Sequence, residues 1–161
     1  MLGFDPSLPP LVRDARRARA LLADAGYPKG FQTTLDATPA YRNVASLVAS
    51  QLAEVGLRVQ VSYLKPEALL AHIEQQSEFY LHSWVQGDDA AEFLHSFLHT
   101  KDPARGHGLR NRTGYSNPRV DRLIDGALIT FSPRERVGLL REAMGLVMRD
   151  LPWVPLYCPH I

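Results

Sequence analysis

The sequence predicts an α/β fold, in which a partial, mostly parallel sheet is flanked by helices. The first half of the chain repeats the pattern helix–strand three times, and strands separated by single helices are usually parallel neighbours. The composition agrees, because 45% hydrophobic and 22% charged residues are typical of a globular domain and not of a disordered chain. The length of 161 residues fits one ordinary domain or a piece of a larger protein.

The first helix and the first strand have clear local signals. Alanine and leucine recur at helical spacing over residues 14–25. Gly26 is expected to end this helix as a left-handed cap, and Pro28 prevents the helix from resuming. Residues 31–38 then alternate between apolar and polar side chains, which predicts a strand.

The next two helix–strand repeats follow in the same way. Pro39 opens a helix whose apolar stripe ends before Gly56, and residues 57–63 alternate as a second strand. A short helix from Pro66 precedes a third strand over residues 79–84. Because the first two strands alternate instead of being continuously apolar, we expect either one poorly covered sheet face or only part of a sheet.

Beyond the third strand the pattern is mostly helical. Three helices are expected, each opened by an N-cap signal: Asp89 with Glu92, Asn117 with Pro118, and Ser132 with Glu135. The closing segment, residues 152–157, is expected to be extended, and its prolines restrict it to an edge or connecting strand.

Charge, cysteine content and motifs exclude several classes of function. The 18 Lys and Arg residues balance 17 Asp and Glu residues, so the net charge of +1 provides no basic field for nucleic acid. Residues 105–112 lack the Gly-Lys-Thr ending of a phosphate loop. Cys158 is the single cysteine, which excludes a disulfide scaffold, and a catalytic dyad with His160 is not expected.

The proline-rich start has no signal-peptide pattern and is expected to be a linker inside a longer protein.

Two histidines are candidate metal ligands. His95 and His99 are four residues apart on an expected helix, a spacing that suits zinc, and with the carboxylates just upstream they define an alternative function as a metal-binding or hydrolytic module. The zincin signature is missing, because Ser96 follows His95 where that motif has a glutamate. Other residues already form the core stripe of this helix, and spacing secures no third ligand. We therefore expect both histidines to lie in water, with no metal site and no cofactor.

The segment around Trp84 is the candidate ligand site. Trp84 ends the third strand and is followed by Gln86, Asp88 and Asp89. In open α/β sheets ligands bind outside the carboxyl ends of the strands, where an aromatic wall and carboxylates can hold a small molecule. In the alternative interpretation, Trp84 belongs to the core and one of the aspartates only caps the next helix.

Five segments, in their order and spacing, carry a family resemblance. They are ARALLADAGYPKGFQTTL, ASLVASQLAEVGLRVQVSYL, EFYLHSW, NRTGYSNPRVDRLIDGAL and DLPWVPLY. Together they resemble the extracellular solute-binding proteins of ABC importers for dipeptides, oligopeptides, nickel and related solutes (family five). The resemblance covers the chain from about Leu8 to Tyr157, and the segments LLADAGYP and GYSNPRVDRLID are its most specific parts.

The resemblance implies a fold and a role. Members are two-lobed, type II-like periplasmic binding proteins, so residues 1–161 are expected to form a single α/β lobe, most of the C-terminal one. Members are not enzymes. They capture a solute outside the cytoplasmic membrane, here a peptide or similar small molecule, and deliver it to a membrane permease. The implied location is periplasmic or extracytoplasmic, by secretion or a lipid anchor.

The resemblance also implies candidate contacts. Trp84 matches the family tryptophan, and in peptide-binding members an aspartate shortly after it binds the amino group of the ligand. The spacing here differs from the common patterns, so Asp88 and Asp89 both stay candidates. In some members an arginine in the loop after the first strand binds the ligand carboxylate, and Arg42 is the candidate here. Ser83 stands where the family usually has glycine, which leaves the ligand open.

Overall fold

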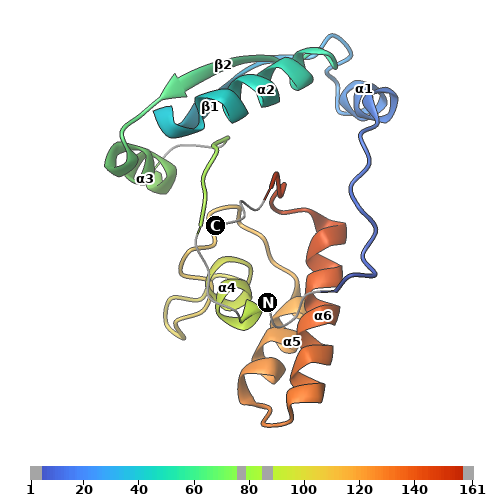
Figure 1. Ribbon diagram of the computed structural model, residues 1–161, viewed down its shortest axis with the longest axis vertical. Helices are drawn as coiled ribbons and strands as arrows, with labels where there is room; N and C mark the ends of the chain where they lie inside the picture. The colour runs from blue at the N-terminus through green and yellow to red at the C-terminus, as the bar shows by residue number, and fades with distance from the viewer. Residues whose placement is uncertain (1–4, 76–78, 85–88, 158–161) are drawn as a thin grey trace. The chain divides into compact units, whose positions relative to one another are not determined.

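The computed structural model describes residues 5–75, 79–84 and 89–157 of the chain (Figure 1). These residues divide into two compact units. The sheet unit comprises residues 10–84, and the helical unit joins the residues before position 10 to the part of the chain from position 85 onward. A single lobe over residues 1–161 stays a prediction.

The sheet unit alternates helices and strands as the sequence predicts. Its elements are α1 (Ala15–Asp24), β1 (Gln32–Ala37), the 3-10 turn η1 (Pro39–Tyr41), α2 (Arg42–Ala53), β2 (Arg58–Tyr63) and α3 (Pro66–Gln75). The side chain of Asp14 caps α1 by accepting the N–H of Arg17 at 2.8 Å, and Gly26 follows the helix with a φ of 89°. Both features confirm the expected start and left-handed stop.

The two strands pair in parallel, which confirms the predicted sheet. The register runs from Gln32 opposite Arg58 to Ala37 opposite Tyr63. The last three residues of β1 are buried, whereas β2 has no buried residue. The sheet is thus buried mainly at the end of β1, and the expectation of one poorly covered face or of a partial sheet stays a prediction.

The third expected strand is reduced to a single bridge. Within residues 79–84, Tyr80 pairs in parallel with Asp36 of β1. The N–H of Asp36 donates to the carbonyl of Phe79 at 3.0 Å, and the N–H of Leu81 donates to the carbonyl of Asp36 at 2.8 Å. The prediction of a full strand is wrong, because the chain leaves the ladder after Leu81. The bridge nevertheless places this segment beside β1, on the side opposite β2.

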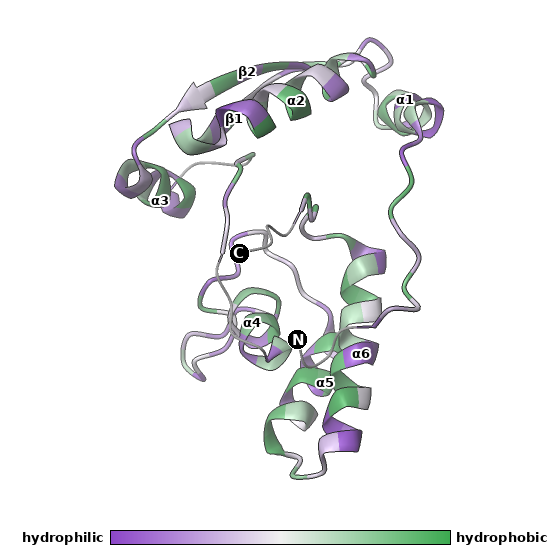
Figure 2. Ribbon diagram, viewed as in Figure 1, coloured by the Kyte–Doolittle hydropathy of each residue, from purple (hydrophilic) through white to green (hydrophobic). Residues whose placement is uncertain are grey.

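The helical unit consists of α4 (Ala90–Phe97), α5 (Pro118–Ile129) and α6 (Pro133–Asp150). All three expected N-caps are confirmed: Asp89 accepts the N–H of Ala91, Asn117 those of Arg119 and Val120, and Ser132 that of Glu135. Figure 2 shows hydrophobic and hydrophilic residues interleaved along α5 and α6, as expected for helices with one buried and one solvent-facing side. The buried cluster of this unit comprises Ala90, Ala91, Leu94, Phe97, Leu98, Val120, Ile124, Ala127, Leu140, Ala143, Leu146 and Val147.

The closing segment differs from its prediction. After α6, Leu151 has a left-handed φ of 47°, and residues 152–157, all of them described, form no strand. Trp153 instead packs edge-on against Phe93 and Phe97, with ring centroids 5.7 and 5.3 Å apart. The expected edge strand is therefore wrong, because the indole of Trp153 anchors the segment to the helical core in place of a sheet. In the parts of the chain that the structure describes, every helix is too short or too polar to cross a membrane.

Candidate functional site

Parallel strands end at the same edge of a sheet, and the candidate ligand residues of the sheet unit gather there. We call this region the carboxyl edge and define it by Tyr41, Arg42, Tyr63, Ser83 and Trp84. Tyr63 is the last residue of β2, and the turn η1 carries the chain from β1 into α2. The bridge between β1 and the segment at residues 79–81 brings the part of the chain that carries Ser83 and Trp84 to the same edge.

Arg42 is positioned over the end of β2. It is the first residue of α2, and its guanidinium carbon lies 4.4 Å from the centroid of the Tyr63 ring. A guanidinium stacked on an aromatic face keeps its charge and its planar set of donors. Arg42 is exposed to solvent, so these donors can reach a carboxylate outside the protein.

A side-chain hydrogen bond joins the two loops of the carboxyl edge. The hydroxyl groups of Tyr41 and Ser83 are hydrogen-bonded to each other. Arg42 and Trp84 directly follow these two residues in the chain, so the contact brings the segments of both candidates together. Trp84 is 41% exposed, and its ring lies 6.4 Å from that of His82. This exposure opposes the interpretation of Trp84 as a core residue.

Sequence reasoning missed two residues of the carboxyl edge and one buried carboxylate in β1. Tyr41 and Tyr63 gave no signal, because their partners are distant in the chain. Asp36 is buried in β1, 6% exposed, and its carboxylate lies 3.6 Å from Nε2 of His72 in α3. A polar residue within an alternating strand is ordinary, so nothing in the sequence singled out this carboxylate.

Asp89 has the contacts of a helix cap. Its carboxylate accepts the N–H of Ala91 at 2.9 Å and pairs with Nη1 of Arg136 at 2.7 Å. Nε of Arg136 also donates to the carbonyl of Ala127 at 2.9 Å, so Asp89 and Arg136 link the start of α4 to α5. Gln86 and Asp88, the other two candidates after Trp84, lie outside the described residues.

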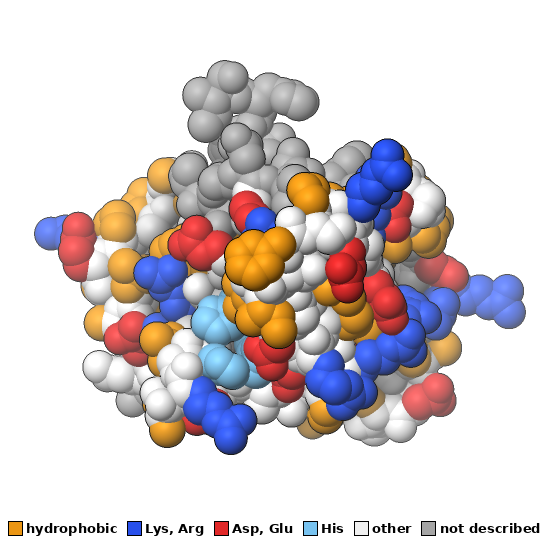
Figure 3. Space-filling view, turned by 90° about the horizontal axis from the view of Figure 1, so that it is seen from below, with side chains coloured by type: hydrophobic (Ala, Val, Ile, Leu, Met, Phe, Trp, Pro, Cys, Tyr) orange, Lys and Arg blue, Asp and Glu red, His pale blue; other side chains and the backbone are white. Residues whose placement is uncertain are grey.

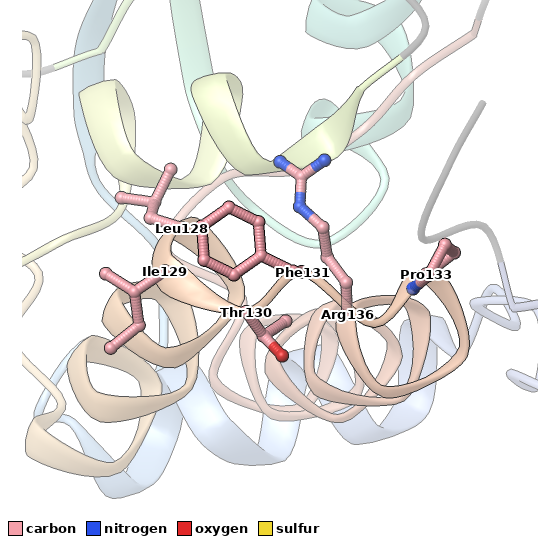
Figure 4. Close-up of a pocket in the computed structure, with 6 residues that line it drawn as sticks. All are labelled: Leu128, Ile129, Thr130, Phe131, Pro133 and Arg136. Carbon is pink, nitrogen blue, oxygen red and sulfur yellow. The ribbon is translucent and has the colours of Figure 1, made fainter.

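A surface hollow lies at the turn between α5 and α6 (Figure 4). Its lining residues are Leu128, Ile129, Thr130, Phe131, Pro133 and Arg136. The side chain of Phe131 is fully exposed, and the hydroxyl of Thr130 donates to the carboxylate of Glu135 at 3.0 Å. A binding site for a polar solute needs several convergent polar groups, and this lining is mostly apolar. The carboxyl edge is therefore the better candidate for a solute site.

The capping role of Asp89 can be tested by two substitutions. Asp89→Ala is expected to lower the free energy of unfolding by about 1 kcal/mol, because the N–H of Ala91 loses its acceptor. Asp89→Asn keeps an acceptor and loses only a partly exposed ion pair with Arg136, so a smaller loss is expected. Urea denaturation of both variants checks this. An equal loss in the two variants would assign the effect to the ion pair and contradict the capping role.

Comparison with known proteins gives a family and several relatives. The family described as bacterial extracellular solute-binding proteins, family 5 Middle, matches residues 1–104. The glutathione-binding protein GsiB of Shigella flexneri is 30% identical over 167 residues, covering 96% of this chain and 32% of the relative. The same protein of Salmonella typhi is 29% identical over 168 residues, with the same coverage. The chain thus spans about a third of the length of the curated relatives that it matches.

Solved structures share the fold. The periplasmic binding protein DppA of Helicobacter pylori, in complex with the peptide STSA, matches with a TM-score of 0.85 and 27% identity, covering 96% of this chain and 30% of that one. A dipeptide-binding protein of Pseudoalteromonas sp. SM9913, in complex with Met-Leu, matches with a TM-score of 0.78 and 26% identity, covering 94% and 31%.

Proposed function

The chain belongs to the bacterial extracellular solute-binding proteins of family 5, and we propose that it serves to capture a peptide or similar small solute for an ABC importer. The family and its matched relatives are binding proteins rather than enzymes. The α/β fold class and the family resemblance of the sequence are thereby confirmed. The alternative function, a metal-binding or hydrolytic module built on His95, His99 and nearby carboxylates, is not favoured.

The proposal extends to architecture and location. Residues 1–161 would form one lobe, most of the C-terminal one, of a two-lobed protein that closes over its solute by a hinge motion. The chain covers about a third of the length of its relatives, which supports its assignment to one lobe. The complete protein would act in the periplasm or on the outer face of the cytoplasmic membrane, secreted or lipid-anchored, and would deliver the solute to the membrane permease.

The observation that carries the proposed site is an exposed cation and an exposed indole at the carboxyl edge, on two loops joined by the hydrogen bond between Tyr41 and Ser83. Arg42, held over the ring of Tyr63, would bind the terminal carboxylate of a peptide. Trp84, 41% exposed, would provide a flat apolar wall for a side chain. Gln86, Asp88 and Asp89 stay candidates for the amino group, and for Asp89 a ligand contact would have to coexist with its capping contacts.

The proposal is tested by calorimetry on the complete gene product with glutathione, dipeptides and tripeptides. At least one of these solutes is expected to bind with micromolar affinity. Arg42→Ala and Trp84→Ala should each weaken that affinity about tenfold or more, about 1.4 kcal/mol, with little change in melting temperature. Arg58→Ala is the matched control, because Arg58 is an exposed arginine at the opposite end of β2. The 161-residue chain alone should bind no peptide more tightly than about 1 mM, because one lobe supplies only part of the contacts.

Three results would contradict this account. If no peptide binds the complete protein, the proposed solute class is wrong. If neither Arg42→Ala nor Trp84→Ala weakens binding, or if Arg58→Ala weakens it equally, the solute does not sit at the carboxyl edge. Micromolar binding by the 161-residue chain alone would show that a second lobe is not needed for affinity.

A further inference from the structure

Three histidine rings meet in the helical unit. We call His95, His99 and His107 the histidine cluster. The ring centroids of His95 and His99 are 5.7 Å apart, those of His95 and His107 are 5.1 Å apart, and those of His99 and His107 are 4.2 Å apart. Figure 3 shows histidine side chains gathered in one patch beside acidic side chains. Sequence spacing paired only His95 with His99 and gave no sign of His107.

The structure corrects the expectation for His99. α4 ends at Phe97, so His99 lies beyond the helix and not on its face. It is 6% exposed, so it does not lie in water. The expectation that both histidines flank the helix in solvent is therefore wrong for His99, because α4 ends two residues before it and its ring is buried.

The loop that carries His107 is fixed against the end of α4. His107 and Asp102 exchange two backbone hydrogen bonds, at 3.0 and 2.9 Å. The buried amide of Asn111 donates to the carbonyl of His99 at 3.0 Å. Gly108 has a φ of 58° and approaches so closely that an added Cβ would lie 2.3 Å from the same carbonyl. The position of His107 beside His99 is thus set by the fold before any ligand arrives.

Hydrogen bonding fixes the protonation pattern of the His99 ring. Nδ1 lies 2.9 Å from the carbonyl oxygen of Thr100, and because a carbonyl only accepts, Nδ1 carries the hydrogen. Thr100 is itself held by the carboxylate of Asp121, which accepts from its N–H at 2.9 Å and from its hydroxyl at 2.5 Å. A backbone carbonyl that orients one ring nitrogen is the usual support of a histidine that binds metal through the other.

The other nitrogen of His99 lacks a hydrogen-bond partner. Nε2 is buried, and although a carboxylate oxygen of Asp125 lies 3.3 Å away, the contact does not meet the geometry of a hydrogen bond. A buried polar atom left without a partner is costly, and a bound cation would satisfy it.

The surrounding donors suit a transition metal. His99, His107 and Asp125 each offer one ligand atom, and these atoms lie within 4.8 Å of one another. In tetrahedral zinc sites with bonds of about 2.1 Å, ligand atoms are about 3.4 Å apart. A small movement of the side chains would therefore bring the three ligand atoms to the spacing of a zinc site. Asp125, whose side chain is 50% exposed on α5, has room for this movement. Two imidazoles and one carboxylate leave a fourth position for water, as in many zinc sites.

We propose that His99, His107 and Asp125 bind one divalent transition metal ion, with zinc as the best fit. The ion would tie the loop at residues 101–116 to α5 within the helical unit. This proposal replaces the expectation of no metal site, which rested on the lack of a third ligand. It is independent of the solute-binding role and assigns no catalytic step to the ion.

The test uses the 161-residue chain, prepared without a histidine tag and freed of metal with a chelator. Titration with zinc in a calorimeter is expected to show one ion per chain, bound with micromolar or tighter affinity, and a melting temperature raised by several degrees. His107→Ala and Asp125→Asn should each weaken zinc binding tenfold or more. His72→Ala is the matched control, because His72 lies in the sheet unit outside the histidine cluster. It should leave affinity and stoichiometry unchanged.

Circular dichroism of the metal-free variants separates loss of a ligand from loss of the fold. Asp125→Asn changes few atoms on a half-exposed side chain, so it is expected to keep the native spectrum and lose the metal. Zinc binding weaker than about 100 μM in the unmodified chain would overturn the proposal. It would also be overturned if Asp125→Asn and His107→Ala both kept full affinity, or if His72→Ala removed the binding.

Discussion

The Ile124→Ala substitution is expected to lower the free energy of unfolding by about 2–5 kcal/mol. Ile124 lies on α5, is fully buried and belongs to the cluster around which α4, α5 and α6 pack. Removing its outer carbons loses the transfer free energy of those atoms and leaves a cavity that the surrounding helices can fill only in part. Urea denaturation followed by far-ultraviolet circular dichroism measures the loss.

The same helix supplies a matched control. Ile129 is the last residue of α5 and is 77% exposed, so Ile129→Ala removes the same atoms from a solvent-facing position. Its effect should stay within about 0.5 kcal/mol. If the two variants lost similar amounts of stability, the buried cluster of the helical unit would not be centred where the structure places it.

The Gly30→Ala substitution is expected to destabilise the sheet unit by about 2–5 kcal/mol. Gly30 has a φ of 71°, which costs a residue with a side chain about 1–2 kcal/mol. An added Cβ would also lie 1.9 Å from the carbonyl oxygen of Gly56, so two backbone segments would have to separate, at about 1–3 kcal/mol. These two glycines precede β1 and β2, and their close approach lets the N–H of Arg58 donate to the carbonyl of Phe31 at 2.9 Å as the sheet begins.

The Gly26→Ala substitution separates the two contributions to the loss of stability expected for Gly30→Ala. Gly26 has a φ of 89°, and a Cβ added there would meet nothing within 4 Å. Gly26→Ala should therefore cost only the left-handed conformation, about 1–2 kcal/mol. Denaturation of both variants under identical conditions gives the difference. Equal losses would show that the approach of Gly30 to Gly56 does not matter for the stability of the sheet unit.

Local signals in the sequence were sufficient for most elements of the fold. The left-handed stop of α1, the N-caps of α4, α5 and α6, the two paired strands and the family all follow from local signals or from the family resemblance. Caps and turns are read correctly because the hydrogen bonds that form them span only a few residues, as between Asp14 and Arg17. Failures came where a distant contact replaced a local preference, as where Trp153 packs on Phe93 and Phe97 in place of an edge strand.

The sequence by itself determined most of the helices, the two paired strands and the family to which the chain belongs. Only the tertiary structure placed Arg42 on the ring of Tyr63 and joined Tyr41 to Ser83. Only the tertiary structure brought His107 beside His99. Periodicity and capping record interactions within one or two turns of the chain, whereas these pairs form because packing and loop closure bring together residues that no local pattern connects.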